Sequence, residues 1–226
     1  MSSLSLWAAA LVCAIAAIFW VWGHQDLPFL FLSGDERNYS EIGRRIATSR
    51  GFTTGVIYPI EVGWGVDHDR SSLLRPPLWP LLLAGSFSVA PVEERTAHLL
   101  VGFCFMITCL LAYAIGARLH GPLVGLIAGV TSAATPTFSQ FAMIAGTEML
   151  LALWIALATL LIIRKSNPFW IGAVCGLAYL TRYNAGVLLV AGLLFLPPGR
   201  PRWKPYALCL SGFMVAGGPW WIRNAM

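Results

Sequence analysis

The sequence begins with an apolar run that limits the possible folds more than any other feature. Residues 4–22 (LSLWAAALVCAIAAIFWVW) carry no charged side chain. A helix of about 20 apolar residues is long enough to cross a bilayer. A cleaved signal peptide would have basic residues before the run and small residues at its end, but this run ends in Trp20, Val21 and Trp22. We therefore predict an uncleaved first membrane span.

The rest of the chain has the composition of a membrane protein. Of its 226 residues, 58% are hydrophobic and 11% are charged. We predict an all-α, polytopic membrane helical bundle of about seven spans. It forms a single module with a first span at 4–22, an external loop at 23–97 containing interfacial helices, and six further spans within 98–226. The further apolar runs are 98–117, 121–135, 148–163, 168–181, 184–197 and 205–221, and a shorter one at 77–90 is predicted to stay at the interface.

Charged residues predict the orientation of these spans. With seven spans, one side of the membrane receives Arg118, Arg164, Lys165, Arg200, Arg202 and Lys204, and the short loops opposite receive only Arg182 and Arg223. Basic residues favour the cytoplasmic side, so residues 23–97 and all ten acidic residues are predicted to lie outside. We expect a multi-pass protein of the bacterial inner membrane, with its active site facing the periplasm. The net charge of +5 suits membrane lipids or phosphate ligands, and the apolar composition argues against nucleic acid.

A cluster of charged residues, SGDERNYSEIGRR at 33–45, follows the first span. Ser33 and Glu36 fit a capping box, which predicts a helix start. Apolar residues then recur at helical spacing, which predicts an amphipathic helix on the outer membrane surface: Tyr39, Ile42 and Ile46. Asp35 and Glu36 either stabilise the helix N-terminus or serve as a base for an incoming nucleophile.

The runs at 168–181 and 184–197 are unusually short for spans. Each would be about 21 Å long as a helix, so the Thr181-Arg182-Tyr183-Asn184 turn is predicted to lie below the outer surface. An arginine at membrane depth marks a candidate functional site. Six tryptophans are predicted to lie in aromatic belts at the interfaces: Trp20, Trp22, Trp79, Trp203, Trp220 and Trp221.

Several motifs occur in a characteristic order along essentially the whole chain. D-E-x-x-Y follows the first span, and RPPLWPLLL, TPTFSQFAMIAGTEMLLALWIALATLL, GAVCGLAYLTRYNAGVLLV and GPWWIRN come after it. This pattern resembles the GT-C superfamily of membrane glycosyltransferases. It is most similar to the branch of protein O-mannosyltransferases and lipid A aminoarabinose transferases. The resemblance implies an inverting transferase that moves a hexose or pentose from a polyprenyl-phosphate donor to a glycan, lipid or protein acceptor on the external face.

The resemblance also assigns roles to single residues. Asp35 takes the position of the catalytic acid, with Glu36 beside it. Arg75, before Pro-Pro, takes the position of the donor-phosphate contact, and the hairpin supplies Arg182. Guanidinium groups bind phosphate oxygens bidentately, which fits a lipid-phosphate leaving group. Further candidates are Glu148, His68, Tyr39 and Arg223.

Structural roles remain open for the same residues. Arg75 could be an interfacial side chain that reaches toward water, and Arg182 could serve only as the buried partner of Glu148. Arg223 could anchor the last helix at the lipid headgroups.

The sequence predicts no cofactor. Asp67, His68 and Asp69 are adjacent and cannot all face one ion unless the loop folds back. Leu74 stands where the aminoarabinose branch carries an acid, which argues against a metal site of that kind and against that branch's substrate.

Two other functions compete with the enzyme. One is a non-catalytic module that binds polyprenyl phosphate or a partner transferase, because the chain stops at Met226, where GT-C enzymes are usually much longer. The other is a small transporter with a broken-helix site at residues 181–184, although no inverted repeat supports it. The presence of Asp35 favours the enzyme.

Overall fold

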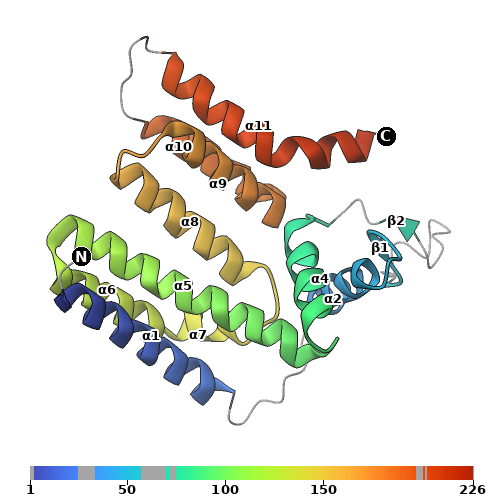
Figure 1. The fold of residues 1–226 in the computed structure, drawn as a ribbon, viewed down its shortest axis with the longest axis horizontal. Helices are drawn as coiled ribbons and strands as arrows, with labels where there is room; N and C mark the ends of the chain where they lie inside the picture. Colours follow the sequence, from blue (N-terminus) through green and yellow to red (C-terminus); the bar gives the residue numbers. More distant parts are fainter. Residues whose placement is uncertain are drawn as a thin grey trace.

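The computed structural model describes residues 3–24, 34–56, 70–71, 75–196, 201 and 203–225, and these are mostly helical (Figure 1). Every apolar run predicted as a span is a helix. Because the bounds follow the apolar runs closely, the sequence alone located these helices; the number of membrane crossings stays a prediction. The helices are α1 (Ser3–Gly23), α5 (Glu94–His120), α6 (Pro122–Ala134), α8 (Glu148–Ile163), α9 (Pro168–Thr181), α10 (Val187–Leu194) and α11 (Lys204–Ala225).

Two helices in the described part of the chain are long and apolar enough to cross a membrane, Ser5–Gly23 and Glu94–His120. The predicted short pair is confirmed as a pair of short helices. Helix α9 ends at Thr181, a 3-10 helix η1 (Tyr183–Gly186) follows, and α10 has only 8 residues. Neither helix of the pair matches the roughly 30 Å of a hydrocarbon core at 1.5 Å per residue.

The long loop after α1 contains two helices, α2 (Gly34–Ala47) and α4 (Leu78–Val89). It also contains a two-residue antiparallel ladder, β1 (Thr53–Thr54) with β2 (Arg70–Ser71), which the sequence did not predict. Helix α2 starts where the capping box predicts a helix, although Ser33 lies outside the described residues. The apolar face of α2 differs from expectation, because Tyr39 and Ile42 are buried in the interface with α4 rather than exposed for a membrane surface.

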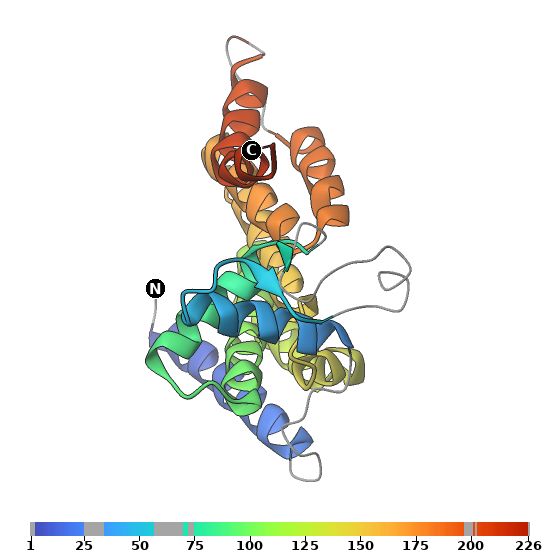
Figure 2. The same cartoon turned by 90° about the vertical axis from the view of Figure 1, so that its right-hand side faces the viewer.

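Helices α2 and α4 lie at one end of the bundle, where the start of α8 and the end of α11 also lie (Figure 1). Figure 2 looks onto this end, with α2 crossing in front of the other helices. The basic residues Arg118, Arg164, Lys165 and Lys204 belong to the opposite ends of α5, α8 and α11. The described acidic residues therefore lie toward the end that carries α2 and α4, whereas these four basic residues lie toward the other end; the membrane topology itself stays a prediction.

Two tryptophans, one buried and one partly buried, connect helices to the segment before α8. Trp79 of α4 is 0% exposed and donates its indole N–H to the carbonyl of Ala145 at 3.1 Å. Trp20 of α1 donates to the carbonyl of Ala142 at 3.0 Å. Both carbonyls belong to the segment around α7 (Pro136–Ala142) that leads into α8. Trp79 was predicted to lie in an aromatic belt, and its complete burial corrects that prediction.

Helices α9 and α11 approach each other closely because each helix places a glycine against the backbone of the other. A Cβ atom on Gly172 would lie 1.8 Å from the carbonyl oxygen of Cys209, and one on Gly212 would lie 2.0 Å from that of Phe169. Pro219 lies inside α11 and cannot donate a helical hydrogen bond. The helix bends before its C-terminus, which directs its last turn toward the end that carries α2 and α4 (Figure 1).

We expect Gly43→Leu to separate α2 from α4. A Cβ at position 43 would lie 2.8 Å from the Cβ of Leu83 and 3.2 Å from the carbonyl oxygen of Pro80, so the two helices must move apart. Overpacking of this kind costs about 1–3 kcal/mol of stability, and it moves Asp35 away from Arg75. Thermal unfolding measures the first effect, and the distance between labels attached to α2 and α4 measures the second. The matched control is Gly85→Leu, where a Cβ meets nothing within 4 Å; equal losses in both variants would contradict the close packing at Gly43.

Candidate functional site

The first turn of α2 places Asp35 beside Arg75. Nη2 of Arg75 lies 2.5 Å from Oδ1 of Asp35, and the two residues are 40 positions apart in the sequence. The Asp35 side chain is 57% exposed and the Arg75 side chain is 19% exposed. The carboxylate is therefore accessible from solution, while the guanidinium is largely enclosed by protein.

Arg75 is held by its surroundings as well as by this ion pair. Pro76 and Pro77 are buried behind it and lead into α4. Its guanidinium carbon lies 5.1 Å from the ring centroid of Tyr39, which is a cation–π distance. Burial raises the pKa of the Tyr39 hydroxyl, and the charge of Arg75 and a hydrogen bond with it oppose that rise. The phenol therefore stays neutral at physiological pH.

A second ion pair joins the start of α8 to the hairpin after α9. Nη1 of Arg182 lies 2.6 Å from Oε1 of Glu148, across 34 positions of sequence. Arg182 has extended backbone angles and separates α9 from η1, so the helix break itself presents this side chain. The Arg182 side chain is 38% exposed and the Glu148 side chain is 30% exposed, so a ligand can reach both.

The two ion pairs belong to one site because several contacts connect the elements that carry them. Trp79 binds the loop just before Glu148. The hydroxyl of Tyr183, next to Arg182, donates to the carbonyl of Arg75 at 3.3 Å. The charges of Asp35, Arg75 and Arg182 all act on the Tyr39 hydroxyl. We define this arrangement as the paired-charge site: Asp35, Arg75, Glu148, Arg182 and Tyr39.

Glu36, the other predicted carboxylate, differs from Asp35 in its exposure. It is only 1% exposed, so Asp35 is the accessible member of the pair. Asn38, also buried, accepts a hydrogen bond from the Thr54 hydroxyl at 2.8 Å. Polar residues in the first turns of α2 therefore alternate: Asp35 is exposed, whereas Glu36 and Asn38 point into the protein interior.

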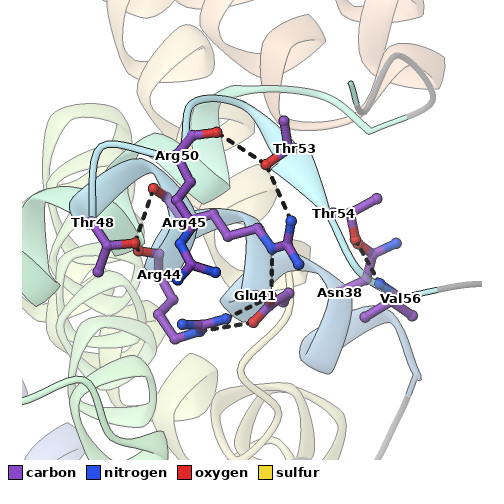
Figure 3. A network of polar contacts seen from close by, with 9 residues as sticks. All are labelled: Asn38, Glu41, Arg44, Arg45, Thr48, Arg50, Thr53, Thr54 and Val56. Carbon is purple, nitrogen blue, oxygen red and sulfur yellow. Dashed lines mark hydrogen bonds and ion pairs between the residues drawn. The ribbon is translucent and has the colours of Figure 1, made fainter. Parts of the chain in front are cut away.

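A polar network fixes the second half of α2 against β1 (Figure 3). Glu41 accepts hydrogen bonds from Arg44 at 2.7 and 2.8 Å and from Arg45 at 2.6 Å. Arg45 also reaches the Thr53 hydroxyl at 3.5 Å. Burial acts to raise the pKa of Glu41, but the hydrogen bonds and charges of the two arginines lower it overall. The Glu41 carboxylate therefore has a structural role, and Asp35 in the first turn of α2 is the carboxylate that a ligand can reach.

Arg223, near the end of α11, contacts two aromatic rings. Its guanidinium carbon lies 4.8 Å from the ring centroid of Trp220 and 5.3 Å from that of Phe52. The Phe52 and Trp220 rings are 4.9 Å apart. These contacts join α11 to the segment after α2.

An apolar groove with a volume of about 300 Å³ runs beside the Arg182–Glu148 pair. It is lined from α8 by Leu151 and Ile155, and from the hairpin and α10 by residues that include Asn184, Leu188 and Ala191. Leu151 lies one helical turn beyond Glu148, and Asn184 lies two positions beyond Arg182. The lining is therefore close in sequence to both charged residues, although neither Glu148 nor Arg182 itself lines the groove.

The structure brings together most of the residues predicted from sequence. Asp35, Tyr39, Arg75, Glu148 and Arg182 meet at one end of the bundle, and Arg223 lies on an adjoining aromatic contact. Asp67, His68 and Asp69 lie outside the described residues. Within the described ranges, no group of three or more His, Cys, Asp or Glu side chains is arranged to hold a metal ion. Sequence analysis missed Tyr183 and Phe52, whose positions beside the arginine hairpin and after α2 carried no charge or spacing signal.

A family model described as dolichyl-phosphate-mannose-protein mannosyltransferase matches residues 74–217. The matched region starts just before Arg75 and includes Glu148 and Arg182. No curated protein and no solved structure matches the chain.

Proposed function

Because the chain belongs to the dolichyl-phosphate-mannose-protein mannosyltransferase family, a family of membrane glycosyltransferases, we propose that the paired-charge site transfers a sugar from a polyprenyl-phosphate donor. The acceptor is a hydroxyl or amine of a glycan, lipid or protein, and the transfer inverts the anomeric carbon. One observation carries this proposal. Two carboxylate–guanidinium pairs, Asp35–Arg75 and Glu148–Arg182, lie on connected elements at one end of an apolar bundle.

The arginines would bind the phosphate of the donor. A guanidinium has five N–H donors, so Arg75 can bind phosphate oxygens while it still contacts Asp35, and Arg182 can do so beside Glu148. Negative charge grows on this phosphate as the sugar bond breaks, and fixed cations stabilise that charge most in a site with little water. The apolar groove beside Arg182 suits the hydrocarbon chain of such a donor.

Asp35 would act as the general base. It accepts the proton of the acceptor while the acceptor oxygen or nitrogen attacks the anomeric carbon from the face opposite the phosphate. The new glycosidic bond forms as the carbon–oxygen bond to phosphate breaks. The polyprenyl phosphate leaves with the bonding electron pair, and its charge is balanced by Arg75 and Arg182. Asp35 is suited to this role because its side chain is the exposed member of its ion pair.

The site is proposed to face the periplasm. Support comes from the basic residues at the opposite helix ends, Arg118, Arg164, Lys165 and Lys204, because positive charge favours the cytoplasmic side.

The test is transfer of label from polyprenyl-phosphate-linked radioactive mannose in membranes that contain the full chain. We expect label to move from the lipid to endogenous acceptors, and Asp35→Asn to abolish most of that movement. Sealed vesicles of both orientations report which face supplies the acceptor. Donor binding without transfer would indicate the non-catalytic binding module, and absence of both would contradict the proposed donor.

A further inference from the structure

The hydroxyl of Tyr183 lies between two partners from distant parts of the chain. It is 3.0 Å from the indole nitrogen of Trp220 and 3.3 Å from the carbonyl oxygen of Arg75. An indole N–H can only donate and a carbonyl can only accept, so the hydroxyl accepts from Trp220 and donates to Arg75. One hydroxyl group thus joins α11, the hairpin after α9 and the segment that leads into α4.

This connection links the two arginines of the paired-charge site through their backbones. Tyr183 directly follows Arg182 and is the first residue of η1. The carbonyl that it binds belongs to Arg75 itself, immediately before the buried Pro76 and Pro77. The Arg182 backbone is therefore connected to the backbone of Arg75 through the side chain of the adjacent Tyr183.

Trp220 is itself held in place. Its ring packs against Phe52 at 4.9 Å and under the guanidinium of Arg223 at 4.8 Å. Trp220 directly follows Pro219 in the last part of α11, which points toward the end of the bundle that carries α2 and α4 (Figure 1). The indole N–H that binds Tyr183 is thus oriented by one contact from the segment after α2 and one from the next turn of α11 itself.

We propose that Tyr183 and Trp220 are positioning residues that fix the spacing of the Arg75 and Arg182 guanidinium groups, so that both bind the same donor phosphate. Arginine side chains are long and flexible, and binding costs less when their backbones are already at the required spacing. The assignment of a phosphate to this spacing rests on the proposed function, whereas the connection between the two backbones does not.

The chain contains a matched control one helical turn earlier. The hydroxyl of Tyr179 accepts from the indole nitrogen of Trp221 at 3.3 Å. The Tyr179 ring packs against Phe213 at 5.8 Å, within the interface between α9 and α11. Tyr179→Phe and Tyr183→Phe therefore remove the same chemical group from similar tyrosine–tryptophan pairs, and only the Tyr183 hydroxyl is bonded to the carbonyl of Arg75.

The first experiment measures spacing without any ligand. Spin labels are attached to Leu81→Cys on α4 and Val187→Cys on α10, which are 49% and 71% exposed, after replacement of the five native cysteines by alanine. We expect Tyr183→Phe to broaden the distance distribution between the labels, and Tyr179→Phe to leave it at the width of the parent. Unchanged widths in both variants, or equal broadening in both, would overturn the positioning role.

The second experiment measures binding of polyprenyl phosphate and of uncharged polyprenol to the full chain. Tyr183→Phe should weaken phosphate binding about threefold to tenfold, the size expected for loss of one hydrogen bond, with little change for polyprenol. In an Arg75→Ala background the same change should have no further effect, because it acts through Arg75.

Three outcomes separate the possible explanations. An undiminished effect of Tyr183→Phe in the Arg75→Ala background would mean direct ligand contact and would overturn the positioning role. Equal loss of phosphate binding in Tyr179→Phe would overturn it as well. A wild-type chain that binds polyprenol as tightly as polyprenyl phosphate would contradict the proposed donor, while the broadened label distances would still establish the connection between the two segments.

Discussion

Asp35→Asn should lower turnover roughly 100-fold or more, because loss of a general base typically costs a factor of 10² to 10⁴. The substitution keeps the size of the side chain and an oxygen that can accept from Arg75, so folding should change little. Donor binding should be equal or slightly stronger, since a negative charge next to the phosphate site is removed. The measurement is kcat and donor affinity in the same preparation.

Measuring kcat together with donor affinity distinguishes a catalytic role of Asp35 from a positioning role. If Asp35 served only to hold Arg75 in place, its loss would weaken donor binding at least as much as turnover. Glu41→Gln is the matched control, because it neutralises another carboxylate of α2 that is bound to Arg44 and Arg45. An Asp35→Asn enzyme within a few-fold of the parent would return this residue to a structural role at the helix N-terminus.

Arg182→Ala is expected to weaken binding of polyprenyl phosphate by about tenfold to a hundredfold relative to uncharged polyprenol. A hydrogen bond to a charged group contributes about 1.5–3 kcal/mol, and each 1.4 kcal/mol corresponds to a factor of ten. Arg182→Lys should recover only part of the affinity, because lysine keeps the charge and loses the two-pronged geometry. The ratio of the two lipid affinities is the measured quantity.

The partner of Arg182 provides the control. Removing the arginine leaves Glu148 without its 2.6 Å partner, which can weaken binding through structure alone. Combining Glu148→Gln with Arg182→Ala removes that uncompensated charge. If the double variant regains the phosphate preference, Arg182 serves only Glu148 and has no place in the donor site. If the preference stays low, the guanidinium itself binds phosphate.

The sequence located the helices well because their signals are local. Helices α8 and α9 have the bounds of the apolar runs 148–163 and 168–181 from which they were predicted. The break at Arg182 was also visible, since two short runs meet there. The sequence did not predict correctly what covers the apolar faces of α2 and α4. The apolar side of α2 was assigned to the membrane surface and Trp79 to an aromatic belt, yet both are buried inside the protein.

The reason is that an apolar residue has the same periodicity whether lipid or protein covers it. Trp79 and Ile42 are each 0% exposed because α2 packs on α4 and α4 packs on the loop before α8. That packing joins segments separated by dozens of residues, such as Trp79 and Ala145. Residue pattern alone contains no information about which of two apolar environments a helix face will meet.

The sequence by itself determined that this chain is a helical membrane protein, because hydropathy and motif order are properties of the linear chain; the placement of its acidic loops on one side of the membrane stays a prediction from the charge pattern. Only the tertiary structure decided which charges meet. Asp35 pairs with Arg75 and Glu148 with Arg182, across 40 and 34 positions. It also showed that Tyr183 joins the two arginines through a carbonyl. A hydrogen bond depends on distances of about 3 Å between atoms, and these are set by how α2, α4 and the hairpin pack together.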